Sequence, residues 1–164
     1  MKILSIVGAR PNFMKIKPIY EEFKKRKIDQ VLVHTGQHYD ENMNRVFFED
    51  LELPKPDVFL GIGSGTHGVQ TGAMMSRIEE VLSLEKPDLT VVVGDVNSTL
   101  AGAISSIKMQ IPVAHVESGY RSFDMRMPEE INRILVDRIS QFLFAPTEDA
   151  VNNLISEGAD KKRI

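Results

Sequence analysis

The chain has 164 residues, which is enough for one domain with one sizeable hydrophobic core. Its hydrophobic content of 42%, charged content of 26% and net charge of −3 are those of an ordinary globular protein, with no basic excess to favour nucleic acid. It has no cysteine, no signal-peptide pattern and no apolar run near the roughly 18 residues that span a bilayer, so we expect a cytoplasmic protein without disulfides, thiolate zinc or a membrane partner.

Short runs rich in β-branched residues alternate with segments of helical periodicity along the chain. We expect strands at residues 2–7, 30–35, 57–60, 89–93, 112–116 and 142–145. We expect helices at 15–26, 40–51 and 128–140. A further helix should run from the glycine-rich link 61–68 to about residue 84, and another should lie between the fourth and fifth strands. The last should begin after a cap at Thr147 and end at Gly158. In helix 128–140 the periodicity predicts four buried residues: Ile131, Ile134, Leu135 and Ile139.

This alternation predicts the fold class. Strands that are almost continuous runs of Val, Ile and Leu, separated by helices, are typical of a parallel sheet covered on both faces. We therefore expect one α/β domain over residues 1–164, a doubly wound, Rossmann-like parallel sheet with right-handed crossovers. The expected strand order is 3-2-1-4-5-6.

Acidic residues stand where two strands end and where the next helix begins. Asp95 follows strand 89–93, Glu117 follows strand 112–116, and Glu129 lies in the first turn of helix 128–140. Ligands of open parallel sheets bind beyond the carboxyl ends of the strands, so the three carboxylates can share one crevice. One acid and one base in a single crevice is what removal and return of a proton require.

Two of these carboxylates also have a purely structural interpretation. Asp95 could cap the helix that follows it. His115 and Glu117 are expected on the same side of a buried strand, where a glutamate must be paired, protonated or functional, and Arg121 could be its partner. The sequence leaves both interpretations open.

Other motifs carry less information. In the turn after the first strand, Arg10 and Lys15 either present two cations to a phosphate or are surface residues. A Gly-x-Gly-x-x-Gly spacing at 63–68 follows the third strand instead of the first, so it indicates no nicotinamide cofactor. His34 and His38 lie on a strand and in the loop after it, and no third ligand is near them, so we expect no metal.

Five motifs in register resemble the non-hydrolysing UDP-N-acetylglucosamine 2-epimerases, including the branch that acts on diacetamido-uronic acid sugar nucleotides. They are Gly8-Ala9-Arg10-Pro11, Thr35-Gly36-Gln37-His38, Gly94-Asp95, His115-Val116-Glu117-Ser118-Gly119 and Pro128-Glu129-Glu130-Ile131-Asn132-Arg133. The resemblance implies two Rossmann domains in the GT-B arrangement, an active site between them and no redox cofactor. It implies elimination of UDP across C1–C2 to a 2-acetamidoglucal, reprotonation of C2 on the opposite face and re-addition of UDP.

The same resemblance implies roles for individual residues. Asp95, Glu117 and Glu129 match the acidic catalytic residues, and Arg10 and Lys15 match positions that contact the nucleotide phosphates. The remaining candidate contacts of the UDP-sugar are Gln37, His38 and Arg121.

The resemblance covers the N-terminal half of the family, so we expect the C-terminal nucleotide-binding domain to be a missing partner. It also implies a UDP-sugar substrate, a homodimer and a role in polysaccharide biosynthesis. Three alternatives to a UDP-N-acetylglucosamine 2-epimerase stay open. They are an epimerase for a UDP-2,3-diacetamido uronic acid, a GT-B glycosyltransferase half-domain that would need an acceptor sugar, and an inactive remnant.

Overall fold

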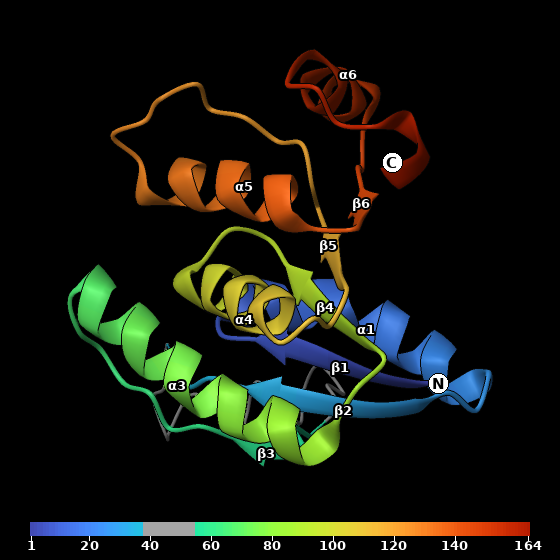
Figure 1. Cartoon of the computed structure of the whole chain (residues 1–164), viewed down its shortest axis with the longest axis vertical. Helices are drawn as coiled ribbons and strands as arrows, with labels where there is room; N and C mark the ends of the chain where they lie inside the picture. The colour runs from blue at the N-terminus through green and yellow to red at the C-terminus, as the bar shows by residue number, and fades with distance from the viewer. Residues whose placement is uncertain (38–54) are drawn as a thin grey trace.

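The chain forms one parallel sheet with helices on both faces (Figure 1). The computed structural model describes residues 1–37 and 55–164, so His38 and the helix expected at 40–51 lie outside the described residues. Within them the elements are β1 (Lys2–Val7), α1 (Arg10–Lys25), β2 (Asp29–His34), β3 (Val58–Phe59), α3 (His67–Glu85), β4 (Leu89–Val93), α4 (Asn97–Lys108), β5 (Val113–Val116), α5 (Pro128–Ile139), β6 (Phe142–Phe144), α6 (Glu148–Ser156) and a 3₁₀ turn (Lys161–Arg163). The sheet order is β3-β2-β1-β4-β5-β6, which confirms the predicted fold class and strand order.

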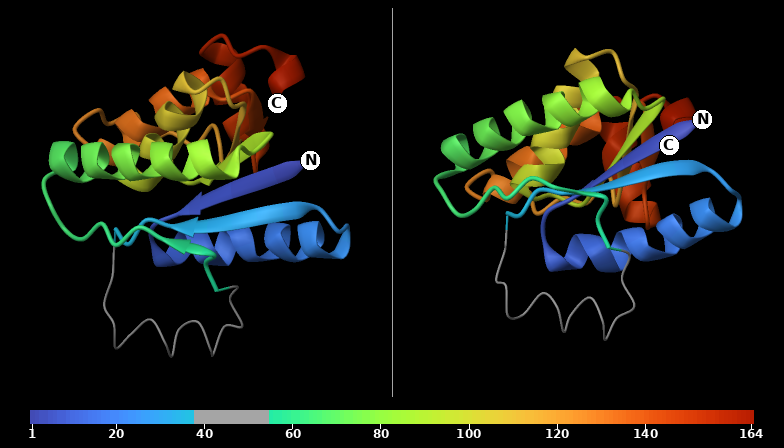
Figure 2. Two further views of the ribbon diagram at one scale, coloured as in Figure 1. Left: turned by 60° about the horizontal axis from the view of Figure 1, so that its bottom comes forward. Right: turned by 90° about the horizontal axis from the view of Figure 1, so that it is seen from below.

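Alternate side chains of the strands build two apolar cores, one on each face of the sheet. Figure 2 shows α1 on one face, with α3 and α4 on the other. Ile3 of β1 packs with Phe13 of α1, whereas Leu4 of β1 packs with Met74 of α3. Each large apolar side chain that is fully buried contributes roughly 1.5–3 kcal/mol. The two cores therefore fix the strands, and with them the loops at the strand ends.

Helix α1 begins at Arg10, whereas the periodicity predicted a start at residue 15. Pro11 lies in its first turn, where the fixed φ of proline suits a helix and its missing N–H removes no bond. The side-chain oxygen of Asn12 accepts the backbone N–H groups of Gly8 (3.2 Å) and Ala9 (3.0 Å). The turn is thereby limited to Gly8 and Ala9, and Arg10 lies on the helix instead of in a loop.

Helix α5 presents a different face to the protein from the one predicted. Ile131 and Leu135 are 40% and 44% exposed, so their predicted burial is wrong, and Ile134 and Ile139 are only half-buried. The buried residues of this helix are Glu130, Asn132, Val136 and Asp137. Three of these four are polar and hydrogen-bond to neighbouring loops, and this requirement outweighs the apolar periodicity.

The other expected boundaries agree with the structure to within about two residues, except that β3 is shorter than expected. The predicted ends of α6 are confirmed, because the Thr147 side chain accepts the N–H of Ala150 and Gly158 has a left-handed φ of 84° just after the helix. None of the described helices is long and apolar enough to cross a lipid bilayer.

Candidate active site

Two of the three predicted carboxylates follow the carboxyl ends of the neighbouring strands β4 and β5. Asp95 follows Gly94, which turns the chain after β4 with a φ of 72°. A Cβ added to Gly94 would lie 3.5 Å from Oε2 of Glu117, so the glutamate carboxylate lies against the residue before Asp95. Glycine at position 94 therefore allows the left-handed turn and the close approach of the Glu117 carboxylate to that turn.

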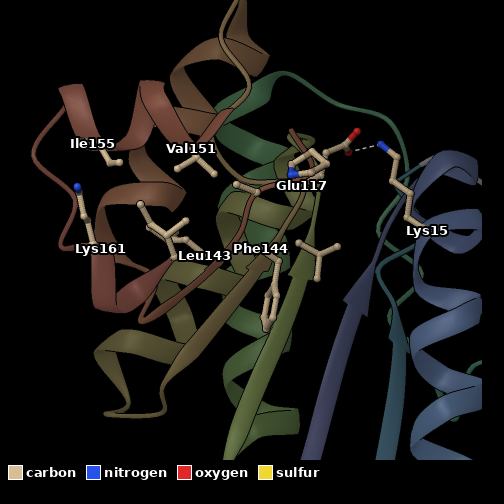
Figure 3. A pocket seen from close by; sticks show the side chains of 11 residues that line it. Lys15, Glu117, Leu143, Phe144, Val151, Ile155 and Lys161 are labelled. Atoms are coloured by element: carbon tan, nitrogen blue, oxygen red, sulfur yellow. Dashed lines mark hydrogen bonds and ion pairs between the residues drawn. The ribbon is translucent and has the colours of Figure 1, made fainter. Parts of the chain in front are cut away.

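Glu117 has a strained backbone and a cationic partner. Its φ of 72° is in the left-handed region, which costs a residue other than glycine about 1–3 kcal/mol. Its N–H donates to the carbonyl of Phe144 (3.1 Å), and its carboxylate accepts the ammonium of Lys15 from α1 (Figure 3). The left-handed conformation turns Glu117 out of the strand direction and toward α1.

Two expectations about this residue are wrong. Because β5 ends at Val116 and Glu117 turns toward α1, Glu117 does not share the side of His115, whose ring faces α5. Arg121 also does not pair with Glu117: its guanidinium is 1% exposed and binds Asp137 (2.8 Å) and Glu157 (2.6 Å). Burial opposes the charge of Arg121, but the two carboxylates outweigh it and raise the pKa of the guanidinium.

Asp95 is held from α5. Nη2 of Arg133 donates to its carboxylate (2.5 Å), and the amide of Asn132 donates to its backbone carbonyl (2.8 Å). Burial disfavours the Arg133 charge, but Glu130 and Asp95 outweigh it and raise the pKa of the guanidinium. The capping alternative for Asp95 is wrong, because Val96 occupies the cap of α4 without a side-chain hydrogen bond.

Glu129 and Glu130 are adjacent on α5 but have opposite surroundings. Glu129 is half-buried, and among the described residues its side chain has no hydrogen-bond or ion-pair partner. Glu130 is 1% exposed and accepts the N–H groups of Ser122 and Phe123 and the guanidinium of Arg133. The carboxylate of Glu129 is thus available to a ligand, whereas that of Glu130 anchors the loop before α5.

The supporting roles of Glu130, Arg133 and Asp137 were not predicted from the sequence. One signal could have revealed them, because positions 130, 133 and 137 have helical spacing and form a polar stripe on α5. A charged stripe on a helix is ordinarily read as its solvent face, and here it is the buried one.

Three residues predicted to contact a ligand, Arg10, Lys15 and Gln37, lie in different surroundings. Arg10 is exposed on the first turn of α1, and Lys15 follows on the same helix beside Glu117. The N-terminal N–H groups of a helix together with two cations can bind an anion such as phosphate. Gln37 is 8% exposed, and its Oε1 accepts the backbone N–H (3.1 Å) and hydroxyl (2.7 Å) of Ser98, so it ties the end of β2 to α4.

An open cavity of about 960 Å³ adjoins the pair of Lys15 and Glu117 (Figure 3). Its lining is mainly apolar and comes from β5, β6, α6 and the end of the described chain: Val116, Leu143, Phe144, Val151, Ile155 and Ile164. No group of three or more histidine, aspartate or glutamate side chains in the described part of the chain is arranged to hold a metal ion. Glu117 and Lys15 thus border an apolar hollow, whereas Asp95, which is paired with Arg133, and Glu129 are not among the residues that line it.

Comparison with known proteins relates this arrangement to one family. A family model described as UDP-N-acetylglucosamine 2-epimerase matches residues 21–164. A UDP-N-acetylglucosamine 2-epimerase of Methanocaldococcus jannaschii is 56% identical over 164 residues, which are 100% of this chain and 45% of that protein. A UDP-2,3-diacetamido-2,3-dideoxy-D-glucuronate 2-epimerase of Pseudomonas aeruginosa is 52% identical over 163 residues, 99% of this chain and 46% of that protein.

Solved structures agree with the sequence matches. The crystal structure of the Methanocaldococcus jannaschii UDP-GlcNAc 2-epimerase in complex with UDP-GlcNAc and UDP has a TM-score of 0.96, at 56% identity, and is matched over 100% of this chain and 45% of that one. The Neisseria meningitidis UDP-GlcNAc 2-epimerase bound to UDP-GlcNAc has a TM-score of 0.92, at 34% identity, over 99% and 44% of the two chains. The chain spans about half the length of the curated relatives it matches.

Proposed function

Because the chain belongs to the UDP-N-acetylglucosamine 2-epimerase family, we propose that it supplies the acid–base half of a UDP-sugar 2-epimerase. The observation that supports this proposal is the approach of Glu117 to the turn that carries Asp95. Glu129, which has no partner among the described residues, lies on the helix that holds Asp95. Inversion at C2 needs one group to take a proton from one face of the sugar and another to return a proton to the opposite face. We assign that task to Asp95, Glu117 and Glu129, two of which follow neighbouring strands of the sheet.

In the proposed reaction a carboxylate removes the C2 proton while the bond between C1 and the UDP oxygen breaks, leaving a C1–C2 double bond. A second carboxylic acid protonates C2 on the opposite face, and UDP re-forms the bond to C1. No electrons are gained or lost overall, so the reaction needs no redox cofactor. Arg10 and Lys15 would attract the departing diphosphate, since both cations lie on the first turns of α1.

The rest of the nucleotide site would come from a second domain in the GT-B arrangement, which the lengths of the relatives support. A UDP-sugar contact for Arg10, Lys15, Gln37, His38 and Arg121 remains a proposal. So do the homodimer, the cytoplasmic location and the role in polysaccharide biosynthesis.

A diacetamido uronic acid nucleotide is the second candidate substrate. The relative from Pseudomonas aeruginosa with that name is 52% identical to this chain, close to the 56% of the UDP-N-acetylglucosamine 2-epimerase from Methanocaldococcus jannaschii. Turnover of each nucleotide sugar by the same preparation distinguishes the two.

The test uses a fusion of residues 1–164 to the segment of the Methanocaldococcus jannaschii relative that lies beyond the match. The fusion is incubated with each UDP-sugar in D₂O, and the product is examined by NMR and mass spectrometry. We expect deuterium at C2 of the epimerised product, and a fall in turnover of about 10²-fold in Asp95→Asn or Glu117→Gln, the scale of acid–base contributions. Epimerisation that retains the original C2 hydrogen, or a folded fusion that turns over neither sugar, would contradict the proposal.

A further inference from the structure

A buried polar pair, His115 of β5 and Asp137 of α5, connects the two turns that carry Asp95 and Glu117. The side chains of His115 and Asp137 are 0% and 4% exposed. Nδ1 of His115 lies 2.6 Å from Oδ1 of Asp137, and Nε2 lies 2.8 Å from the carbonyl oxygen of Gly94. The histidine ring therefore bridges α5 to the residue directly before Asp95.

Asp137 reaches the other turn. Its Oδ2 accepts the backbone N–H of Gly119 (3.1 Å), two residues after Glu117, and a guanidinium N–H of Arg121 (2.8 Å). Gly94 is fixed from its other side as well, because its N–H donates to the carbonyl of Val116 (3.0 Å). One histidine–aspartate pair thus holds a backbone group next to each of the two catalytic candidates.

The hydrogen-bond partners fix the orientation of the His115 ring. The carbonyl of Gly94 can only accept, so Nε2 of the ring donates to it. Nδ1 is held at the same time by Oδ1 of Asp137. The ring therefore cannot turn about its Cβ–Cγ bond without losing both hydrogen bonds.

His34 provides a contrast within the same chain. It is 4% exposed, and its Nδ1 accepts the N–H of Gly36 (2.7 Å). Burial lowers the pKa of His34 to about 4, so its ring is neutral at pH 7.5. His34 is hydrogen-bonded to the turn after β2, whereas His115 is hydrogen-bonded to the residue before Asp95, so His34 serves as the control histidine.

We infer that His115 and Asp137 are positioning residues that set the relative placement of the Asp95 and Glu117 carboxylates. The inference rests on the proposed function for its catalytic meaning. Neither side chain is accessible to a substrate, so the pair acts on the reaction only through the two turns. A buried polar pair is an inefficient source of stability compared with apolar packing, whereas its directional hydrogen bonds specify geometry. Displacement of a reacting group by about 1 Å can cost about 10²-fold in rate.

The first test is made on the chain itself and needs no activity. The chain is labelled with ¹⁵N-histidine and its imidazole signals are recorded at pH 7.5, with His115→Gln and His34→Gln used to assign them. We expect the Nε2–H of His115 to exchange slowly with solvent and to lie close to the backbone amide of Asp95 in nuclear Overhauser spectra, and we expect no such contact for the ring of His34. A His115 ring without a protected Nε2–H, or without that contact, would overturn the inference, and this result requires only the wild-type chain to be folded.

The second test asks whether the pair couples the two turns. Asp137→Asn should shift the amide signals of Gly94 and Asp95, which Asp137 does not touch, through the altered His115 ring. His115→Gln should in turn shift those of residues 117–119 through Asp137. His34→Gln is the matched control, since it replaces the other buried histidine and should leave both turns unshifted. Shifts that stay confined to the direct neighbours of each substituted residue would overturn the inference.

A kinetic readout separates this inference from the proposed function. In the active fusion, His115→Gln should lower kcat by about 10²-fold with little change in KM, because His115 contacts Asp137 and the Gly94 carbonyl and none of the proposed substrate contacts. A rise in KM at unchanged kcat would contradict a positioning role. An inactive fusion would count against the proposed function alone, since the two NMR tests still decide whether the pair holds the two turns.

Discussion

Replacing Glu130 by glutamine should destabilise the chain, whereas the same replacement at the adjacent Glu129 should not. The carboxylate of Glu130 is buried and accepts the N–H of Ser122 (3.0 and 3.1 Å to its two oxygens), the N–H of Phe123 (2.9 Å) and a guanidinium N–H of Arg133 (2.9 Å). Glutamine keeps one of the two side-chain oxygens as an acceptor and places an NH₂ group where the other oxygen met its N–H donors. Since each hydrogen bond to a charged group contributes about 1.5–3 kcal/mol, we expect a loss of about 2–4 kcal/mol in the free energy of unfolding.

The measurement is urea denaturation of the wild type, Glu129→Gln and Glu130→Gln at pH 7, followed by circular dichroism. The urea midpoint of Glu130→Gln should fall at an unchanged m-value, and Glu129→Gln should stay within about 0.5 kcal/mol of the wild type, as expected for a site without partners. Equal midpoints for the two variants would refute the conclusion that Glu130 anchors the loop before α5.

The same variants give a test by pH. Burial alone would raise the pKa of Glu130, but the N–H of Ser122, the guanidinium of Arg133 and the N–H of Phe123 outweigh burial and hold the pKa below its ordinary value of 4.5. The folded state therefore binds this proton more weakly than the unfolded chain does. The contribution of Glu130 is complete above pH 4.5 and is lost as the pH falls through the lower, folded-state value, so the stability gap to Glu130→Gln should narrow there. A gap that widens would contradict the assignment.

Two further predictions concern a glycine pair and a buried histidine. Gly119 and Gly158 have left-handed φ values of 83° and 84°, but a Cβ at Gly119 would lie 2.3 Å from the carbonyl oxygen of Ala150, whereas one at Gly158 would meet nothing within 4 Å. In urea denaturation Gly158→Ala should therefore lower the free energy of unfolding by only about 1–2 kcal/mol, the cost of the left-handed backbone. Gly119→Ala should lower it by at least about 3 kcal/mol, because the added Cβ also clashes with α6. Equal losses would show that α6 moves aside at little cost. Burial lowers the pKa of His34 from 6.5 to about 4, so the unfolded chain binds this proton more tightly than the folded one. The free energy of unfolding should therefore fall by up to about 3 kcal/mol as the pH drops from 6.5 to about 4. His34→Gln should make this slope shallower, and an unchanged slope would show that other groups cause it.

The strand order was predictable because the strands are the strongest signal in the sequence. The four central strands contain short runs of apolar residues that the sheet buries, and right-handed crossovers leave few arrangements. The orientation of α5 was not predictable by the same reasoning. Hydrophobic periodicity predicts that Ile131 and Leu135 are buried and that Glu130 and Asp137 are exposed. It takes no account of the hydrogen bonds that Glu130 and Asp137 make to loops elsewhere in the chain.

The placement of the candidate acids was predictable for a similar reason, but their partners were not. The end of a strand fixes where Asp95 and Glu117 emerge, and neighbouring parallel strands end at the same edge of the sheet. Lys15 reaches Glu117 only because α1 begins early and because Glu117 adopts a left-handed backbone. Both features depend on packing between segments far apart in sequence, and no local propensity encodes them.

The inverted face of α5 has a consequence for protein engineering. Ile131 and Leu135 occupy solvent-facing positions, so polar replacements there should be tolerated wherever no other surface covers them. Glu130 and Asp137 each fix a loop of the site, so an apolar replacement that makes the helix look more regular would release that loop. A redesign guided by hydropathy alone would thus improve the amphipathic pattern of this helix and remove the hydrogen bonds that hold the loops of the site.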